Sequence, residues 1–363
     1  LKEFIAQKEW VIPPKPSLDL VVDTVEFAAE ETRKVKPISI SGYHIREAGS
    51  TAVEELAFTL ADGLAYVEAC IDRGLDIEEF APQLSFFFNS HNSVFEEVAK
   101  FRAARRIWSR LMDEEFGAGE RERMLKFHTQ TAGQSLTVEQ PLNNIVRTTL
   151  QAFAAVLGGT QSLHTNSYDE AYALPTEKAV KVALRTQQII AEESGAADTI
   201  DPLGGSFYVE KLTDEMEEEA VDLIEEVKER GDGSYVDGVL DGIQQGWFQR
   251  EIRESAFEHQ RRVEEGEETV VGVNKYSEEE EGDIDVLHVD EEAAREIQLE
   301  RLSDVREERS TDEVEEALDA VRGAVETGEN TMPYIVDAIK EYATMGEIME
   351  VFEEEYGSYQ ESF

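Results

Sequence analysis

The sequence predicts an α/β fold in which parallel strands alternate with helices, and three observations support this. Short apolar segments typical of strands recur at roughly forty-residue spacing in the first half of the chain. An amphipathic, helix-like segment follows most of them. Polar or small residues separate each strand from its helix. Such units would form half of an eight-stranded (β/α)8 TIM barrel, although an open doubly wound sheet has the same rhythm.

Each predicted strand is apolar and ends in a polar cluster. In the first, at residues 38–41, Ile38 and Ile40 alternate with serine, and Gly42 then allows the backbone to turn. Further strands are predicted at residues 84–88, 126–131 and 160–164. The clusters after the four strands begin at Tyr43, Asn89, Gln130 and Thr165. Because the carboxyl ends of parallel strands form the active edge of β/α folds, functional side chains are expected there.

Helices are predicted between these strands and beyond them. Amphipathic patterning places them at residues 18–31, 51–73, 92–112, 140–157 and 177–193. After a Pro/Gly-rich turn at 201–206, residues 208–260 are helical in pattern. The acidic run 277–283 is interpreted as an exposed linker, followed by a solvated tail with helices at 291–308, 312–327 and 332–342. We therefore expect the C-terminal part of a barrel at residues 1–260, and a linker with a helical tail at 261–363.

The charge balance is strongly acidic. The 363 residues include 34 basic and 80 acidic side chains, a formal net charge of −46. Such a surface repels the phosphates of nucleic acids and anionic membranes, so both are excluded as partners. The acidity spreads over nearly every helix, which predicts a protein from a halophile whose carboxylates stay hydrated in high salt. An acidic mesophilic protein is the alternative.

Cysteine usage and hydropathy predict a soluble, cytoplasmic protein. Cys70 is the only cysteine, which excludes an intrachain disulfide, and its helical context favours a packing role. The sequence has no apolar run of about 18 residues to span a membrane and no signal pattern. Because residue 1 is Leu rather than Met, we expect a fragment that lacks the N-terminal half of its barrel.

Standard catalytic templates are absent from the sequence: it has no phosphate-binding Gly-rich loop, no H-E-x-x-H, no G-x-S-x-G and no C-x-x-C. The histidines are His44, His91, His128, His164, His259 and His288, and no two have metal-ligand spacing on a helix, so no metal site is predicted. A single histidine after a strand is more often structural. The first four, however, fall at or beside predicted strand ends, which favours a site built from several strands.

Several motifs extend along the whole chain and together resemble one family. They lie at residues 39–49 (SISGYHIREAG), 81–87 (APQLSFF), 102–105 (RAAR), 128–133 (HTQTAG), 160–167 (TQSLHTNS) and 272–276 (GVNKY). They resemble the large, substrate-binding subunit of the methylmalonyl-CoA mutase family. The resemblance implies a TIM barrel that encloses an acyl-CoA, with adenosylcobalamin across the strand ends, and a radical 1,2-rearrangement of the carbon skeleton.

The resemblance also implies roles for single residues. His44 would hydrogen-bond the thioester carbonyl, with Tyr43 packed beside it, and Ser85 would contact the CoA. The residues facing the corrin and its adenosyl group would be Glu47, Gln130, Gly133, Glu170, Ala171 and Ala173. Radical chemistry needs a dry site with neutral hydrogen-bond donors, which accounts for the absence of nucleophile templates.

Two positions depart from the methylmalonyl-type pattern. Gln7 stands where those members have an arginine that binds the free carboxylate of the substrate. A buried carboxylate without a counter-charge costs ~3–5 kcal/mol, and a neutral hydrogen bond returns only about 1 kcal/mol. Together with residues 86–92, Gln7 therefore resembles the isobutyryl-CoA branch, with methylmalonyl-CoA/succinyl-CoA interconversion as the alternative. Gln83 replaces an arginine that contacts CoA in the family.

The resemblance implies a partner subunit. The Asp-x-His-x-x-Gly loop that coordinates cobalt in the family does not occur in the sequence, so the cobalamin-binding domain is absent. We expect a hetero-oligomer with a small cobalamin-binding subunit. Two other classes remain open: a different barrel enzyme, such as an aldolase or a cobalamin-dependent amino-acid mutase, and a non-catalytic assembly partner.

Overall fold

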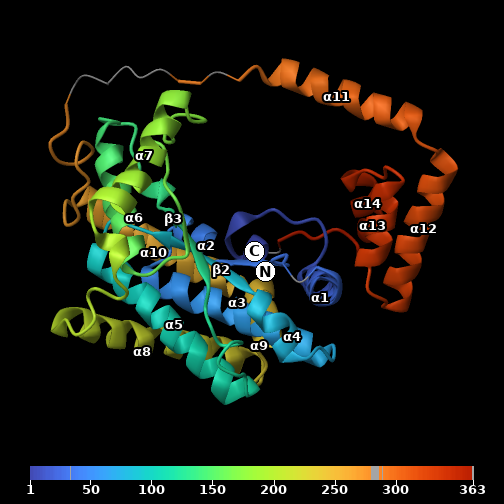
Figure 1. Ribbon diagram of the computed structural model, residues 1–363, viewed down its shortest axis with the longest axis horizontal. Helices are drawn as coiled ribbons and strands as arrows, with labels where there is room; N and C mark the ends of the chain where they lie inside the picture. Colours follow the sequence, from blue (N-terminus) through green and yellow to red (C-terminus); the bar gives the residue numbers. More distant parts are fainter. Residues whose placement is uncertain (33, 279–285, 288, 362–363) are drawn as a thin grey trace.

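A parallel sheet forms the centre of the first half of the chain (Figure 1). The computed structural model describes residues 1–32, 34–278, 286–287 and 289–361. Within them, four strands lie side by side in chain order: β1 (Ser39–Ser41), β2 (Ser85–Ser90), β3 (Phe127–Thr131) and β4 (Ser162–His164). The register pairs Phe87 with His128, and Gln130 with His164. The predicted parallel β/α arrangement is confirmed.

The long helices follow the predicted pattern. They are α1 (Pro14–Glu31), α3 (Ala52–Asp72), α5 (Val94–Phe116), α6 (Asn143–Leu157) and α7 (Glu177–Glu193). Local signals set their ends: Thr51 and Glu54 form a capping box at the start of α3, and Gly117 ends α5 with a φ of 63°. Two short helices, α2 (Tyr43–Glu47) and α4 (Ile77–Phe80), were not predicted.

The two faces of the sheet differ in character. On one face, Phe86 packs against Trp108 of α5 with ring centroids 4.8 Å apart, and Phe88 packs against Phe101. The residues that alternate with them face the opposite side, because successive side chains of a strand point to opposite faces. That second set is Ser39, Ser41, Ser85, Phe87, Asn89, His128, Gln130, Ser162 and His164. We call this side the polar face.

The helices that connect the strands pack on the apolar face. The helices α3, α5 and α6 contact one another in succession, and α3 and α6 contact the strands directly. A doubly wound sheet would carry helices on both faces, so this arrangement favours the barrel over that alternative. Closure into an eight-stranded barrel stays a prediction.

A second helical layer lies outside α3 and α5. It consists of α8 (Phe207–Arg230), α9 (Tyr235–Gln244) and α10 (Trp247–Glu264), which confirms the helical segment predicted after residue 208. Ion pairs join α5 to α8, including Arg102 to Glu210 at 2.8 Å. Cys70 is buried within α3, as predicted, and burial raises the pKa of its thiol to about 12. Among the described residues, no helix has both the length and the apolar character required to cross a bilayer.

Most of the C-terminal tail packs against α1 rather than standing in solvent (Figure 1). Its helices are α11 (Glu291–Glu308), α12 (Thr311–Thr327), α13 (Met332–Lys340) and α14 (Met345–Tyr356), of which α14 was not predicted. Val321 and Phe352 form a second apolar core with Ile12, and α11 alone has no buried residue. The prediction of a solvated tail is therefore wrong for α12 to α14, because each of these helices buries apolar side chains. Most of the predicted acidic linker, and His288, lie outside the described residues.

Truncating Phe352 tests the packing of this tail. Phe352 is 2% exposed, so Phe352→Ala leaves a cavity and should lower the free energy of unfolding of α12 to α14 by ~3–5 kcal/mol. Leu299 on α11 is 49% exposed, and Leu299→Ala should change it by less than ~0.5 kcal/mol. Urea denaturation with amide hydrogen exchange measures both, and equal effects of the two variants would contradict the docked arrangement.

Candidate functional site

The carboxyl ends of the strands bring the two residues predicted to act on the thioester onto the polar face. Tyr43 and His44 begin α2 directly after β1. The Tyr43 ring stacks on Phe87 of β2 with centroids 4.9 Å apart, and the His44 ring meets Phe87 edge-on at 6.0 Å. Phe87 also contacts His128 of β3 at 5.1 Å. These rings therefore form a wall on the side of the sheet away from the α3, α5 and α6 helices.

His44 is a neutral hydrogen-bond donor. Its Nδ1 lies 3.0 Å from Ser41 Oγ and 3.3 Å from Lys2 Nζ. Burial, reinforced by the charge of Lys2, lowers the pKa of the imidazole to about 4. An ammonium group can only donate, so Nδ1 accepts from Lys2 and the ring proton lies on Nε2. Lys2 Nζ also donates to Gln7 Oε1, so the Lys2 side chain bridges His44 and Gln7.

Glu47, Gly133 and Glu170 converge beside this ring wall. Glu47 Oε1 accepts from Asn89 Nδ2 at 2.7 Å, and its Oε2 accepts from Gln134 N at 2.8 Å. A Cβ at Gly133 would lie 2.9 Å from Glu47 Oε2 and 3.2 Å from Glu170 Oε1, so only glycine leaves both carboxyl groups in place. Burial raises the pKa of Glu47 to about 7, and it also raises the pKa of Glu170.

We use the name strand-end cluster for six residues near the carboxyl ends of the strands: Tyr43, His44, Glu47, Gln130, Gly133 and Glu170. Gln130 Nε2 donates to Asn166 Oδ1 at 3.0 Å, which fixes its amide beside the carboxyl end of β4. Ala171 and Ala173 lie in the turn that follows Glu170, and the amide of Ala173 donates to Asp169 O at 3.3 Å.

Gln83 and Ser85 lie apart from the cluster, at the amino end of β2. Ser85 is the first residue of that strand and belongs to the polar face, and its Oγ donates to Ile38 O at 3.4 Å. Gln83 Nε2 donates to Glu79 O at 3.2 Å, while its Oε1 is buried without a partner among the described residues. The predicted CoA contacts therefore lie on the amino side of Phe87, the residue of β2 on which Tyr43 and His44 pack.

A buried ion cluster that sequence reasoning missed supports the end of β2. Lys100 Nζ lies 2.5 Å from a carboxylate oxygen of Glu55 and 2.5 Å from one of Glu97, and all three side chains have no exposed surface. Glu55 accepts from the amide of Asn89 at 2.7 Å, and Lys100 donates to its carbonyl at 2.9 Å. In the sequence, the sign of this cluster is that Glu55, Glu97 and Lys100 stand among the apolar positions of two predicted helices. The cluster fixes Asn89, which in turn holds Glu47.

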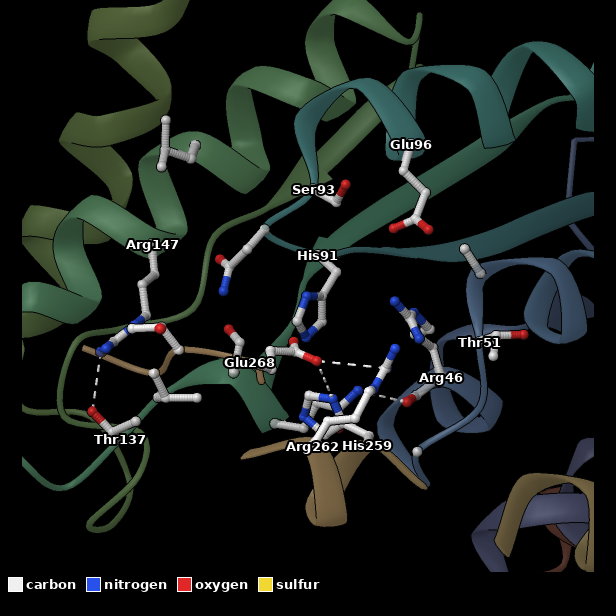
Figure 2. A pocket seen from close by; sticks show the side chains of 18 of the residues that line it. Arg46, Thr51, His91, Ser93, Glu96, Thr137, Arg147, His259, Arg262 and Glu268 are labelled. Carbon is white, nitrogen blue, oxygen red and sulfur yellow. Dashed lines mark hydrogen bonds and ion pairs between the residues drawn. The ribbon is translucent and has the colours of Figure 1, made fainter. Parts of the chain in front are cut away.

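A separate cavity, which we call the rim pocket, lies beyond Gln134 (Figure 2). Its volume is about 810 Å³, and its charged or titratable wall includes Arg46, His91, Glu96, Arg147, Arg262 and Glu268. Burial, together with nearby positive charges, lowers the pKa of His91 to about 3. His91 thus lines this pocket and does not join His44 at the strand-end cluster. His128 and His164 lie on the polar face of β3 and β4.

Comparison with known proteins identifies the family. Residues 1–358 match the family model described as methylmalonyl-CoA mutase. The chain belongs to the methylmalonyl-CoA mutase family. It is 49% identical over 364 residues to the 2-hydroxyisobutanoyl-CoA mutase large subunit of Aquincola tertiaricarbonis, covering 100% of this chain and 64% of that protein.

Other relatives carry the methylmalonyl-CoA mutase name. The chain is 46% identical over 360 residues to methylmalonyl-CoA mutase of Rhizobium meliloti, covering 99% of this chain and 50% of that protein. The mitochondrial enzyme of Homo sapiens is 42% identical over 361 residues, covering 99% and 47%. These relatives are acyl-CoA mutases, which are isomerases. The family member described here spans between about half and 64% of their length.

Replacing Glu47 tests the electrostatics of the cluster. Its folded pKa of about 7 lies above its ordinary value, so raising the pH from 5 to 8 deprotonates a carboxyl that folding keeps protonated, and stability falls. In Glu47→Gln this loss is absent, so its free energy of unfolding relative to the parent should rise by roughly 1–2 kcal/mol between pH 5 and pH 8.

Denaturant titrations at both pH values, at constant salt, measure this difference. Glu353 is exposed on α14, and Glu353→Gln is the matched control that should follow the parent at both pH values. A Glu47→Gln variant with the same pH dependence as the parent would show that this carboxyl does not titrate in the folded state as described.

Proposed function

We propose that this chain is the substrate-binding large subunit of an adenosylcobalamin-dependent acyl-CoA mutase that interconverts isobutyryl-CoA and butyryl-CoA. The observation that carries the proposal is the environment of His44. Its neutral ring is held on the polar face, with Nε2–H as the donor, and Lys2 links it to the uncharged Gln7. A thioester carbonyl and a monocarboxylic acyl chain are the chemistry that suits these two residues.

The polar face offers a track for the acyl-CoA. Ser85 at the amino end of β2 would contact the pantetheine, and the thioester would lie near Phe87, two residues further along the strand. His44 Nε2–H would donate to the thioester oxygen and stabilise charge on it as the acyl group migrates. Tyr43 and Phe87 would exclude water from the reacting carbon atoms, because their stacked rings form one wall.

The strand-end cluster fits the corrin on chemical grounds. Glu47 and Glu170 present carboxyl groups that approach each other because Gly133 has no side chain, and Gln130 presents an amide that is hydrogen-bonded to Asn166. Corrin carries neutral amide side chains, which are suitable partners for these groups, with Ala171 and Ala173 close by in the chain. When bound, adenosylcobalamin would supply the radical chemistry of the 1,2-rearrangement.

A small cobalamin-binding subunit is the proposed partner, in a hetero-oligomer. A relative at 49% identity is named a large subunit, which supports a second polypeptide as the partner. In this proposal residues 1–260 supply the acyl-CoA site, and residues 261–363 form the linker and tail.

The acyl group is the finer part of the proposal. Gln7 favours a substrate without a free carboxylate, and the 2-hydroxyisobutanoyl-CoA named for one relative is also a branched monocarboxylic acyl-CoA. Methylmalonyl-CoA is the second candidate, because relatives at 46% and 42% identity carry that name.

Restoring an arginine at position 7 tests this choice. Gln7→Arg would supply the counter-charge for a buried carboxylate, so the ratio of kcat/KM for methylmalonyl-CoA to kcat/KM for isobutyryl-CoA should rise about a hundredfold. The assay uses the full-length protein with its cobalamin subunit. Gln298→Arg, on the exposed surface of α11, is the control and should leave the ratio unchanged. Faster turnover of methylmalonyl-CoA by the unsubstituted enzyme would contradict the assignment.

Removing the imidazole tests the role of His44. His44→Ala should lower kcat by about 10²–10³-fold with little change in KM, because a donor to developing charge acts mainly in the transition state. Steady-state kinetics with isobutyryl-CoA measure both constants, and a thermal melt establishes that the variant is folded. Full retained activity in a folded variant would remove His44 from the mechanism.

A further inference from the structure

The rim pocket is distinct from the strand-end cluster. Its wall is formed by the end of α2, the connections that follow β2 and β3, and parts of α6, α10 and residues 268–271. Gln134 joins the two regions: its backbone N donates to Glu47 of the cluster, and its Nε2 donates to the carbonyl oxygen of Arg46 at 2.8 Å. His44, Tyr43 and Phe87 do not line the pocket.

The pocket contains positive charge that the protein does not neutralise. Glu268 is already engaged, because it lies 3.5 Å from Arg262 and 3.2 Å from His259 Nδ1. No carboxylate oxygen of the described residues lies within 4.0 Å of the Arg46 or Arg147 guanidinium. Burial, together with the charge of Glu97, raises the pKa of Glu96, while the charges of Arg46 and Lys100 act in the opposite direction. Arginine side chains thus dominate a cavity within a strongly acidic chain.

The two unneutralised arginines keep hydrogen-bonding capacity for a ligand. Arg46 Nη1 donates to Ser50 O, but its buried Nε has no partner among the described residues. Arg147 donates to neutral groups: Nη1 to Thr137 Oγ1 at 3.0 Å and to Asn144 Oδ1 at 2.7 Å, and Nη2 to Val271 O at 2.6 Å. In Figure 2, Arg46, His91 and Arg262 approach the centre of the pocket from different sides, with Arg147 on the opposite wall.

We propose that the rim pocket binds a small organic phosphate, with its phosphate group at Arg46 and Arg262 and its organic part against α6. Arg262 is available although Glu268 is near, because the 3.5 Å between Arg262 Nη2 and Glu268 Oε2 is an ion pair without a hydrogen bond among the described residues. A guanidinium matches the oxygens of a phosphate through paired hydrogen bonds. The volume of about 810 Å³ falls within the range of small-molecule sites. Val146 and Leu150 of α6 supply an apolar wall, and Gln134 and Ser135 supply neutral polar groups.

The overall charge of the chain opposes this binding only at long range. The net charge of −46 repels anions from the molecule, but at physiological salt exposed charges are screened beyond about 8 Å. Arginines inside a partly enclosed cavity are screened less than surface carboxylates. Added salt should therefore weaken the repulsion more than the direct contacts, and binding should persist at about 1 M salt.

Isothermal titration calorimetry of the full-length protein with its partner subunit tests the proposal. The probe is phenyl phosphate, with phenol and inorganic phosphate as comparisons, and saturating butyryl-CoA keeps the proposed acyl-CoA site occupied. Phenyl phosphate should bind saturably and more tightly than inorganic phosphate, and phenol should not bind. Arg46→Gln and Arg262→Gln should each weaken phenyl phosphate at least about tenfold, the loss of one charged hydrogen-bonding partner.

The matched control is Arg106→Gln, which removes an exposed arginine from the α5 and α8 ion pairs outside the pocket and should leave the affinity unchanged. The Arg262 side chain on α10 is 47% exposed, so Arg262→Gln should fold. This variant therefore still tests the proposal if Arg46→Gln does not fold. Absence of saturable binding to the unsubstituted protein would overturn the proposal, and so would two pocket variants that bind phenyl phosphate as tightly as the unsubstituted protein does. Neither result bears on the mutase assignment, which the kinetics of His44 and Gln7 variants decide separately.

Discussion

The alternation of side chains along four short parallel strands is the constraint on which this molecule depends. Phenylalanine residues on one side of β2 and β3 pack against α3, α5 and α6, and this burial fixes the sheet and its helices together. The same alternation places serine, histidine and glutamine on the other side. A shift of one residue in register would exchange the two faces, so the fold and the site are specified by a single pattern.

The charged residues under the end of β2 connect this framework to the chemistry. Lys100 between Glu55 and Glu97 is stable only as a set, because a buried charge without its partner costs ~3–5 kcal/mol. The cluster ties α3 and α5 to the backbone of Asn89. Since Asn89 also holds Glu47, the orientation of a carboxyl group at the site depends on two helices on the apolar side of the sheet.

The positions of the helices and strands could be predicted from the sequence better than the contacts between them. The strands and long helices were predictable because β-branched alternation and amphipathic periods are local signals, and the family motifs identified the strand-end residues. The helix α2 was read as a polar loop, because Tyr43 to Glu47 is too short to show a period. The contact between Asn89 and Glu47, the rim pocket and the packing of α12 to α14 on α1 arise from residues far apart in the chain. Adaptation to high salt, inferred from composition, stays a prediction.

Contacts around α1 join the two ends of the described chain. Tyr359 packs edge-on against Phe4 and Trp10, and Asp23 of α1 accepts hydrogen bonds from Thr331 while pairing with Arg73 of α3. The turn that carries Gln7 is thus braced by residues more than three hundred positions later. In the proposed function, selectivity for the acyl group would therefore depend on residues far from Gln7 in the sequence, and a change at Tyr359, which follows α14, would act on it by loosening that contact.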